Sequence, residues 1–117
     1  MIYMKENFEK PQKYFDCPLT TAMNIIGGKW KVIILGYLSV SPRRFGELKK
    51  LVCGVTQKML TQQLRELEDD GLIHREIFKE IPPKVEYSLT DFGKSLTPIL
   101  HNLYAWGQEI KDNKKLG

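Results

Sequence analysis

Six polar residues in the middle of the chain are spaced so that a helix would gather them on one face. Positions three and four apart are neighbours on a helix, and the set with this spacing is Thr56, Gln57, Lys58, Thr61, Gln62 and Arg65. A glutamine amide can form two hydrogen bonds to adenine, and arginine or lysine can bond guanine or a phosphate. The same pattern is typical of the solvated side of an ordinary amphipathic helix. These six residues form a candidate base-reading face, and the surrounding elements decide its meaning.

Basic residues lie on both sides of this segment and are candidate phosphate contacts. They are Arg43, Arg44, Lys49 and Lys50 before it, and Lys79 and Lys84 after it. Such side chains bind a nucleic-acid backbone without distinguishing its sequence, although a basic residue taken alone is more often a solvated charge. The net charge of +4 suits a polyanionic partner without requiring one. Acidic residues follow at positions 66 and 68–70, so we expect only the amino-terminal part of the helix to approach DNA.

Cys17 is a further candidate because it precedes Pro18 at the expected start of a helix. The positive end of a helix dipole stabilises a thiolate and makes the sulfur more reactive, which would suit a redox sensor. The alternative is a small apolar side chain that fills space, a common role for free cysteine. The second cysteine, Cys53, has no neighbours at zinc-ligand spacing. We therefore expect no metal and no disulfide framework, with both thiols reduced at rest.

The elements that would position these residues follow from apolar periodicity and turn residues. Short helices are expected over residues 18–26, 29–38 and 45–51. A turn containing glycine at residues 52–55 then leads to a fourth helix, which Thr56 caps and which runs to about Asp70. Its inward face would consist of Leu60, Leu64 and Leu67. Two helices joined by such a turn form a helix-turn-helix, with the candidate base-reading face on the second helix.

Two short segments rich in β-branched and aromatic residues follow, Leu72–Phe78 and Val85–Leu89. We expect them to pair as a two-stranded hairpin with a proline-stiffened, basic tip. Thr90 then caps a long helix to about Asp112, whose apolar residues form two stripes, more than one small core needs. The excess predicts a homodimer. The expected interface residues are Ile25, Leu96, Leu100, Leu103 and Ile110.

Length and composition exclude several classes of protein. A chain of 117 residues, 42% of them hydrophobic, fits one compact domain. We expect an arm at residues 1–16, the winged helix-turn-helix domain at 17–112 and a tail at 113–117. The chain lacks a nucleophile motif and a phosphate-binding glycine loop, and its two histidines are far apart, so an enzyme is not expected. The chain shows no signal core and no apolar stretch long enough for a bilayer, which predicts a cytoplasmic protein without membrane contact.

Several stretches, in order along the chain, resemble the HxlR-type winged helix-turn-helix transcriptional regulators, relatives of the MarR group. They are Cys17-Pro18, GGKWKVIIL from Gly27, RRFGELKK from Arg43, TQKMLTQQLRELEDDGL from Thr56 and VEYSLTDFGKSL from Val85. The resemblance implies a dimeric DNA-binding repressor or activator, held together by its terminal helices, in bacteria or archaea. It also implies that Cys17 occupies the place of a thiol that some members use to sense oxidants or electrophiles.

Together these observations predict a mainly helical fold with a small β-hairpin, a winged helix-turn-helix with a long C-terminal dimerisation helix. The predicted function is sequence-specific binding of duplex DNA by a homodimer that regulates transcription, with no cofactor and with a small-molecule or electrophile effector as an open possibility. The alternative is a winged helix used only for protein contacts, because a fold does not by itself define a function.

Overall fold

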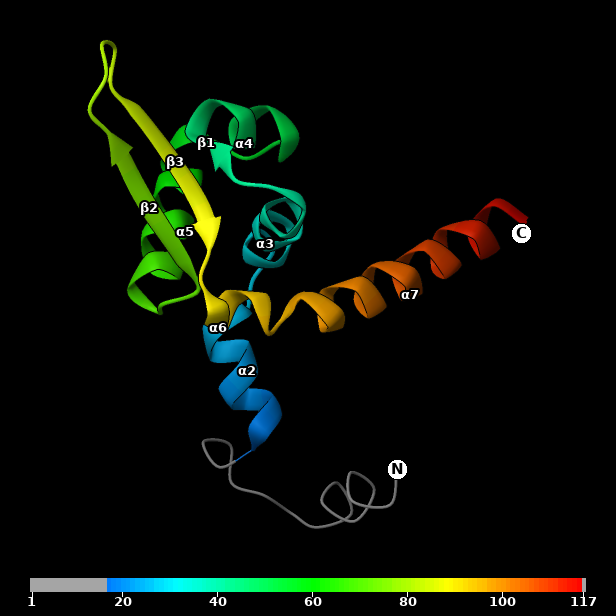
Figure 1. Cartoon of the computed structure of the whole chain (residues 1–117). Helices are drawn as coiled ribbons and strands as arrows, with labels where there is room; N and C mark the ends of the chain where they lie inside the picture. The colour runs from blue at the N-terminus through cyan, green and yellow to red at the C-terminus, as the bar shows by residue number, and fades with distance from the viewer. Residues whose placement is uncertain (1–16, 117) are drawn as a thin grey trace.

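The computed structural model describes residues 17–116, and the arm expected at residues 1–16 lies outside this part. In chain order the elements are α2 (Pro18–Ile26), α3 (Lys31–Val40), β1 (Arg43–Arg44), α4 (Phe45–Leu51), α5 (Gln57–Asp69), β2 (Ile73–Phe78), β3 (Lys84–Leu89), α6 (Asp91–Lys94) and α7 (Thr97–Leu116). Figure 1 shows α3, α4 and α5 beside a small sheet, with α7 extending away from this body. The predicted winged helix-turn-helix with a long C-terminal helix is confirmed.

The sheet has three antiparallel strands in the order β1-β3-β2. β2 and β3 form the predicted hairpin, the wing, with Ile73 opposite Leu89 and Phe78 opposite Lys84. The predicted hairpin is confirmed, and Arg43–Arg44 adds a third strand against β3 that the sequence does not predict. Two residues are too few to show an alternating pattern, so pairing with a distant segment defines β1.

The core lies where α3, α4 and α5 meet the sheet. Its largest fully buried side chains are Ile34, Leu35, Leu48, Leu60, Leu64, Leu67, Ile73 and Val52. On α5, Leu60, Leu64 and Leu67 follow the helical repeat that the sequence shows, and each is at most 2% exposed. Burial of this leucine stripe fixes which side of α5 faces outward.

Both ends of α5 are set by residue types that are visible in the sequence. The Thr56 hydroxyl accepts a hydrogen bond from the backbone N–H of Met59 at 3.0 Å, which satisfies a donor of the first turn. Ahead of it, Gly54 has φ of +88°, a conformation that favours glycine and permits the sharp turn from α4. Gly71 ends the helix with φ of +79°. The expected fourth helix is therefore confirmed.

The long helix expected to start after Thr90 is divided into α6 and α7. Thr90 is the predicted cap, and its hydroxyl accepts a hydrogen bond from Gly93 N at 3.1 Å. Pro98 explains the division, because proline cannot donate to the carbonyl of Lys94 and its ring crowds that carbonyl. Proline is well tolerated in the first turn of a new helix, and α7 begins at Thr97. The expected end near Asp112 is too early, since α7 continues to Leu116.

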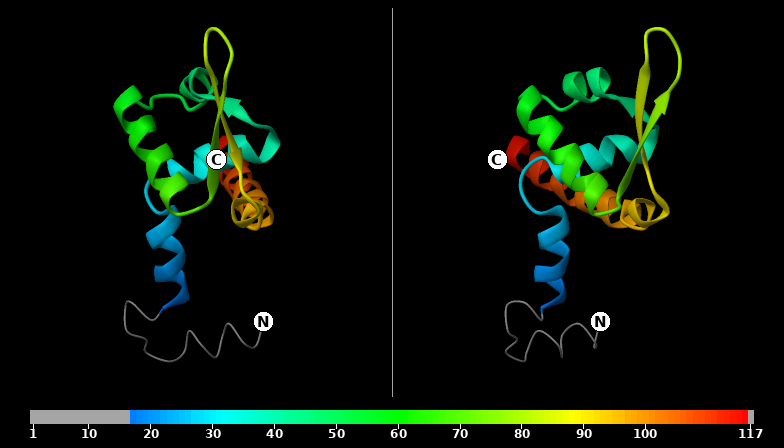
Figure 2. Two further views of the ribbon diagram at one scale, coloured as in Figure 1. Left: turned by 60° about the vertical axis from the view of Figure 1, so that its left-hand side comes forward. Right: turned by 90° about the vertical axis from the view of Figure 1, so that its left-hand side faces the viewer.

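The helices α2 and α7 leave the body in different directions (Figures 1 and 2). No residue of α2 is buried, and Leu19 and Met23 are each more than half exposed. Ile25 and Ile26, at the carboxyl end of α2, pack partly against the core. Most of the apolar side chains of α2 are therefore exposed on the surface of this chain.

Candidate nucleic-acid interface

The outer side of α5 carries the candidate base-reading face. All six of its residues are exposed, and five of them line a shallow hollow: Gln57, Lys58, Thr61, Gln62 and Arg65. The Thr61 hydroxyl donates a hydrogen bond to the carbonyl oxygen of Gln57 at 2.8 Å, so in this conformation it faces other partners only as an acceptor. Because the leucine stripe is buried on the opposite side, the fold holds these amide and cationic groups facing outward.

The acidic residues near the end of α5 are partly neutralised by neighbouring elements. Glu66 lies 3.7 Å from Lys31 Nζ, and Glu68 lies 3.6 Å from Arg75 Nε on β2. The helix has no carboxylate before Glu66. Its first turns are therefore the part most compatible with the phosphates of DNA, as the sequence predicts.

The basic residues around α4 are placed beside the helix-turn-helix. Arg44, Lys49 and Lys50 are exposed, and Arg43 is half-buried. The Arg43 guanidinium donates through Nε to the carbonyl oxygen of Tyr37 at 3.4 Å, a weak bond that ties β1 to α3. Arg44, Lys49 and Lys50 are thus more accessible to a phosphate than Arg43.

The two wing lysines differ in their exposure and in their contacts within the chain. Lys84 is half-buried, with Nζ 3.4 Å from a carboxylate oxygen of Glu86 and 4.7 Å from the centre of the Phe78 ring. Lys79 is exposed in the turn between β2 and β3. A lysine that already has an intramolecular partner gains less from a phosphate. The geometry therefore favours Lys79 over Lys84 as the wing contact.

The candidate DNA contacts gather toward one end of the molecule. In Figures 1 and 2 the wing tip, α4 and the start of α5 lie at the end opposite α2. The helix and the hairpin come from separate parts of the sequence, and the sheet holds them together. This arrangement can place a helix in a major groove while the hairpin reaches a neighbouring phosphate or minor groove.

Cys17 lies away from this end, immediately before α2. It is the residue that precedes the first helical turn, with Pro18 as the first helical residue, and its side chain is partly exposed. The backbone N–H of Thr20, followed by that of Leu19, lowers the pKa of the Cys17 thiol below its ordinary value. Hydrogen bonds of this kind favour the thiolate, which is the nucleophilic form of cysteine.

The exposed apolar stripe of α7 differs from the expected one. It consists of Ile99, Leu103, Trp106 and Ile110, at spacings of four, three and four, each at least 38% exposed. Leu100 is only 8% exposed and belongs to the core of this chain, so its assignment to a dimer interface is corrected. Leu96 and Ile25 also pack partly against that core.

Within residues 17–116 no helix, α7 included, combines the length and apolarity needed to cross a membrane.

A groove of about 520 Å³ adjoins this stripe, between α3 and α7. Its apolar lining includes Val32, Ile33, Tyr37 and Leu103. The groove and the stripe together extend an uncovered apolar surface from α7 onto α3.

Comparison with known proteins identifies the family. Residues 25–115 match the family model described as HxlR-like helix-turn-helix. The chain belongs to the HxlR family. The HTH-type transcriptional regulator YdeP of Bacillus subtilis is 51% identical over 110 residues, which are 94% of this chain and 81% of YdeP. As an HxlR protein, this chain is an HTH-type transcriptional regulator and not an enzyme, which implies that it binds DNA.

Solved structures agree with this membership. The redox regulator HypR in its oxidised form is 47% identical, with a TM-score of 0.77 over 80% of this chain and 96% of that chain. A MarR-family regulator from Porphyromonas gingivalis is 36% identical, with a TM-score of 0.81 over 86% of this chain and 98% of that chain. The fold of this HxlR protein is therefore close to that of MarR-family regulators.

The sequence did not predict several residues of this HxlR protein that form ion pairs with α5 or belong to the exposed stripe of α7. Arg75 and Lys31 pair with carboxylates of α5, and Ile99 and Trp106 belong to the exposed stripe of α7. The last two were visible as apolar helix positions, but periodicity alone does not show which stripe the core takes. No periodic pattern marks either ion pair, because the partners lie on different elements, α3 and α5 in one pair and α5 and β2 in the other.

Proposed function

We propose that this protein is a homodimer that binds a specific duplex DNA sequence and thereby regulates transcription. The observation that carries the proposal is the outward face of α5, where amide and guanidinium groups are exposed above a buried leucine stripe. Glutamine and arginine on the first turns of such a helix can distinguish base pairs in the major groove. The exposed lysine of the wing and those of α4 supply sequence-independent contacts.

Two-fold symmetry would give each half of the operator its own α5. The uncovered stripe of α7 offers a self-complementary apolar surface, since a two-fold axis brings the same patch of both subunits together. Two recognition helices about 34 Å apart would then enter successive major grooves on one side of the duplex. This spacing makes an operator with inverted half-sites the expected target.

Base contacts and phosphate contacts should respond differently to mutation. We expect Gln62→Ala to weaken binding to a duplex selected by the wild-type protein by about 1 to 3 kcal/mol and to relax its sequence preference. Lys79→Ala should weaken binding to every duplex by a similar factor and lower the salt slope by about one unit. Fluorescence anisotropy with selected and random duplexes, over a range of salt concentrations, measures both effects.

Lys84→Ala is the matched control for the wing, because Lys84 has Glu86 and Phe78 as partners. Its effect on the salt slope should be smaller than that of Lys79→Ala. The alternative function, a winged helix that binds only proteins, predicts that the wild-type protein enriches no sequence from a random library. That result, with normal folding, would overturn the proposed function.

We further propose that Cys17 makes the regulator responsive to thiol oxidation. Its lowered pKa and partial exposure support this role, and HypR, which is 47% identical, is a redox regulator. Cys17 lies at the start of α2, away from the DNA-facing end. An adduct there would act by moving α2 against its neighbours and so changing the separation of the two recognition helices.

Alkylation kinetics test the reactivity of this thiol. Because the fold favours the thiolate, Cys17 should react with iodoacetamide at a lower pH than it does in the unfolded chain, and the difference should vanish in denaturant. Diamide should then change DNA affinity in the wild type and in Cys53→Ser but not in Cys17→Ser. An unchanged response to diamide in Cys17→Ser would make Cys17 a structural residue.

A further inference from the structure

Lys31 is the one charged residue buried among the side chains that the structure describes, with 7% of the residue exposed. It is the first residue of α3 and belongs to the GGKWK segment that follows α2. A cation without a partner is expensive to remove from water, so a buried lysine needs a compensating group. Its neighbours therefore indicate what the charge does there.

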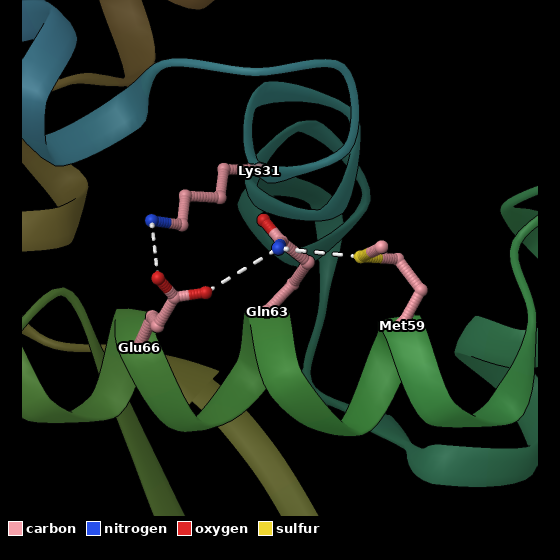
Figure 3. Close-up of polar contacts among 4 residues, drawn as sticks. All are labelled: Lys31, Met59, Gln63 and Glu66. Atoms are coloured by element: carbon pink, nitrogen blue, oxygen red, sulfur yellow. Dashed lines mark hydrogen bonds and ion pairs between the residues drawn. The ribbon is translucent and has the colours of Figure 1, made fainter.

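Figure 3 shows a polar row on α5 that meets Lys31. Lys31 Nζ lies 3.7 Å from one carboxylate oxygen of Glu66, and the other oxygen accepts a hydrogen bond from Gln63 Nε2 at 3.3 Å. The same amide nitrogen lies 3.5 Å from Met59 Sδ. Met59, Gln63 and Glu66 are spaced by four and three residues, so they lie along one side of α5 over about two turns. Through Glu66, Lys31 thus connects α3 to a row of side chains beside the base-reading face.

Trp30, the residue before Lys31, lies close to the turn between α4 and α5. A Cβ atom added to Gly54, in the turn before α5, would lie 3.8 Å from Cη2 of Trp30. Trp30 is otherwise packed partly against the core. Trp30 therefore lies close to the turn that precedes α5, and Lys31 lies close to the second half of α5.

We propose that Lys31 is a positioning residue for DNA recognition, which holds the Glu66 carboxylate toward α3 and away from the base-reading face of α5. Glu66 follows Gln62 by four residues, so the two side chains are neighbours on the helix surface and a released carboxylate would be free to accept a hydrogen bond from the Gln62 amide. The pairing with Lys31 keeps the Gln62 amide available for bases. Lys31 makes no DNA contact itself, because its side chain is only 9% exposed. This proposal rests on the proposed function, since it assumes that α5 reads bases.

Lys31→Met tests the role, because methionine retains an unbranched, apolar side chain without the charge. The Glu66 side chain is 45% exposed, so its carboxylate stays hydrated when Lys31 is replaced, and an ion pair with so exposed a partner contributes little to stability. We therefore expect the melting temperature to change little. Affinity for a duplex that the wild type selects from a random library should fall by about threefold to thirtyfold. Affinity for random duplex and the salt slope should stay at wild-type values, and Lys31→Arg should restore selective binding.

Glu66→Gln and Glu68→Gln form a matched pair on the same helix. Glu66→Gln should reproduce the loss of selective binding, whereas Glu68→Gln, whose partner is the exposed Arg75, should bind as the wild type does. Equal losses on selected and random duplexes in Lys31→Met, or a lower salt slope, would show that Lys31 contacts phosphate and would overturn the proposal. Unchanged affinity for the selected duplex would overturn it as well.

A measurement without DNA separates this proposal from the proposed function. Amide hydrogen exchange over residues 59–66 of the free protein should be faster in Lys31→Met than in the wild type or Glu68→Gln, because α5 has lost its ion pair with α3. Equal exchange in the three proteins would contradict the positioning role. If the wild type selects no duplex while exchange behaves as expected, the proposed function fails and the link between α3 and α5 stands.

Discussion

Gly93→Ala should destabilise the protein by about 2 to 3 kcal/mol and lower its Tm by roughly 10 °C or more. Gly93 is the buried residue of α6. A Cβ atom there would overlap the carbonyl oxygen of Leu72 and lie 3.3 Å from Cδ2 of Leu89. The Leu72 carbonyl cannot retreat easily, because it also accepts a hydrogen bond from the backbone N–H of Thr90 at 3.0 Å. Thermal unfolding followed by circular dichroism measures the effect.

Gly46→Ala is the control for this substitution. Gly46 is a helical glycine of α4, and a Cβ atom there would meet nothing within 4 Å. Alanine in an open helical position should leave stability unchanged or raise it by up to about 1 kcal/mol. If Gly93→Ala were as stable as the wild type, α6 would not pack against the Leu72 backbone as described.

Leu103→Glu should convert the dimer into monomers and weaken operator binding by about a hundredfold or more, because the two half-sites would no longer be bound by one linked unit. Leu103 is 45% exposed in the middle of the α7 stripe and also lines the groove beside α3. A carboxylate in a buried apolar interface is strongly unfavourable. Sedimentation equilibrium gives the mass, and anisotropy gives the affinity for the selected duplex.

Ala105→Glu adds the same charge to a different face of α7. Ala105 is exposed and lies about 160° around the helix from Leu103, at 100° per residue. This variant should remain dimeric and bind DNA as the wild type does. A monomeric wild-type protein at micromolar concentration would contradict the homodimer, and a dimeric Leu103→Glu protein would place the interface elsewhere.

The elements that sequence predicts well are those whose determinants are local. Thr56, the leucine repeat and Gly71 together define α5 within a stretch of sixteen residues, and the structure places its start and end accordingly. The six residues of the candidate base-reading face are exposed for the same reason, since they are the positions that the leucine repeat leaves outside. Helical periodicity needs no information from the rest of the chain.

The features that sequence does not predict depend on contacts between distant segments. β1 exists only because Arg43 and Arg44 pair with β3, and the burial of Lys31 becomes intelligible only beside Glu66. On α7, the apolar pattern shows more than one stripe, but contact with α3 determines that Leu100 faces inward and Leu103 does not. The break before α7 is easier to predict from the sequence, because Pro98 is a local signal for it.

The exposure of α2 has a consequence for how this regulator depends on its own abundance. A helix of nine residues with no buried side chain is marginal in water, so its order must come largely from whatever surface covers it. If that surface is a second subunit, folding of α2 and association are one equilibrium, and dilution melts α2 as it separates the chains. The backbone N–H groups that lower the pKa of the Cys17 thiol, those of Thr20 and Leu19, belong to the first turn of α2. The reactivity of the thiol would then rise with protein concentration, and the proposed response to oxidants would depend on the expression level of the protein.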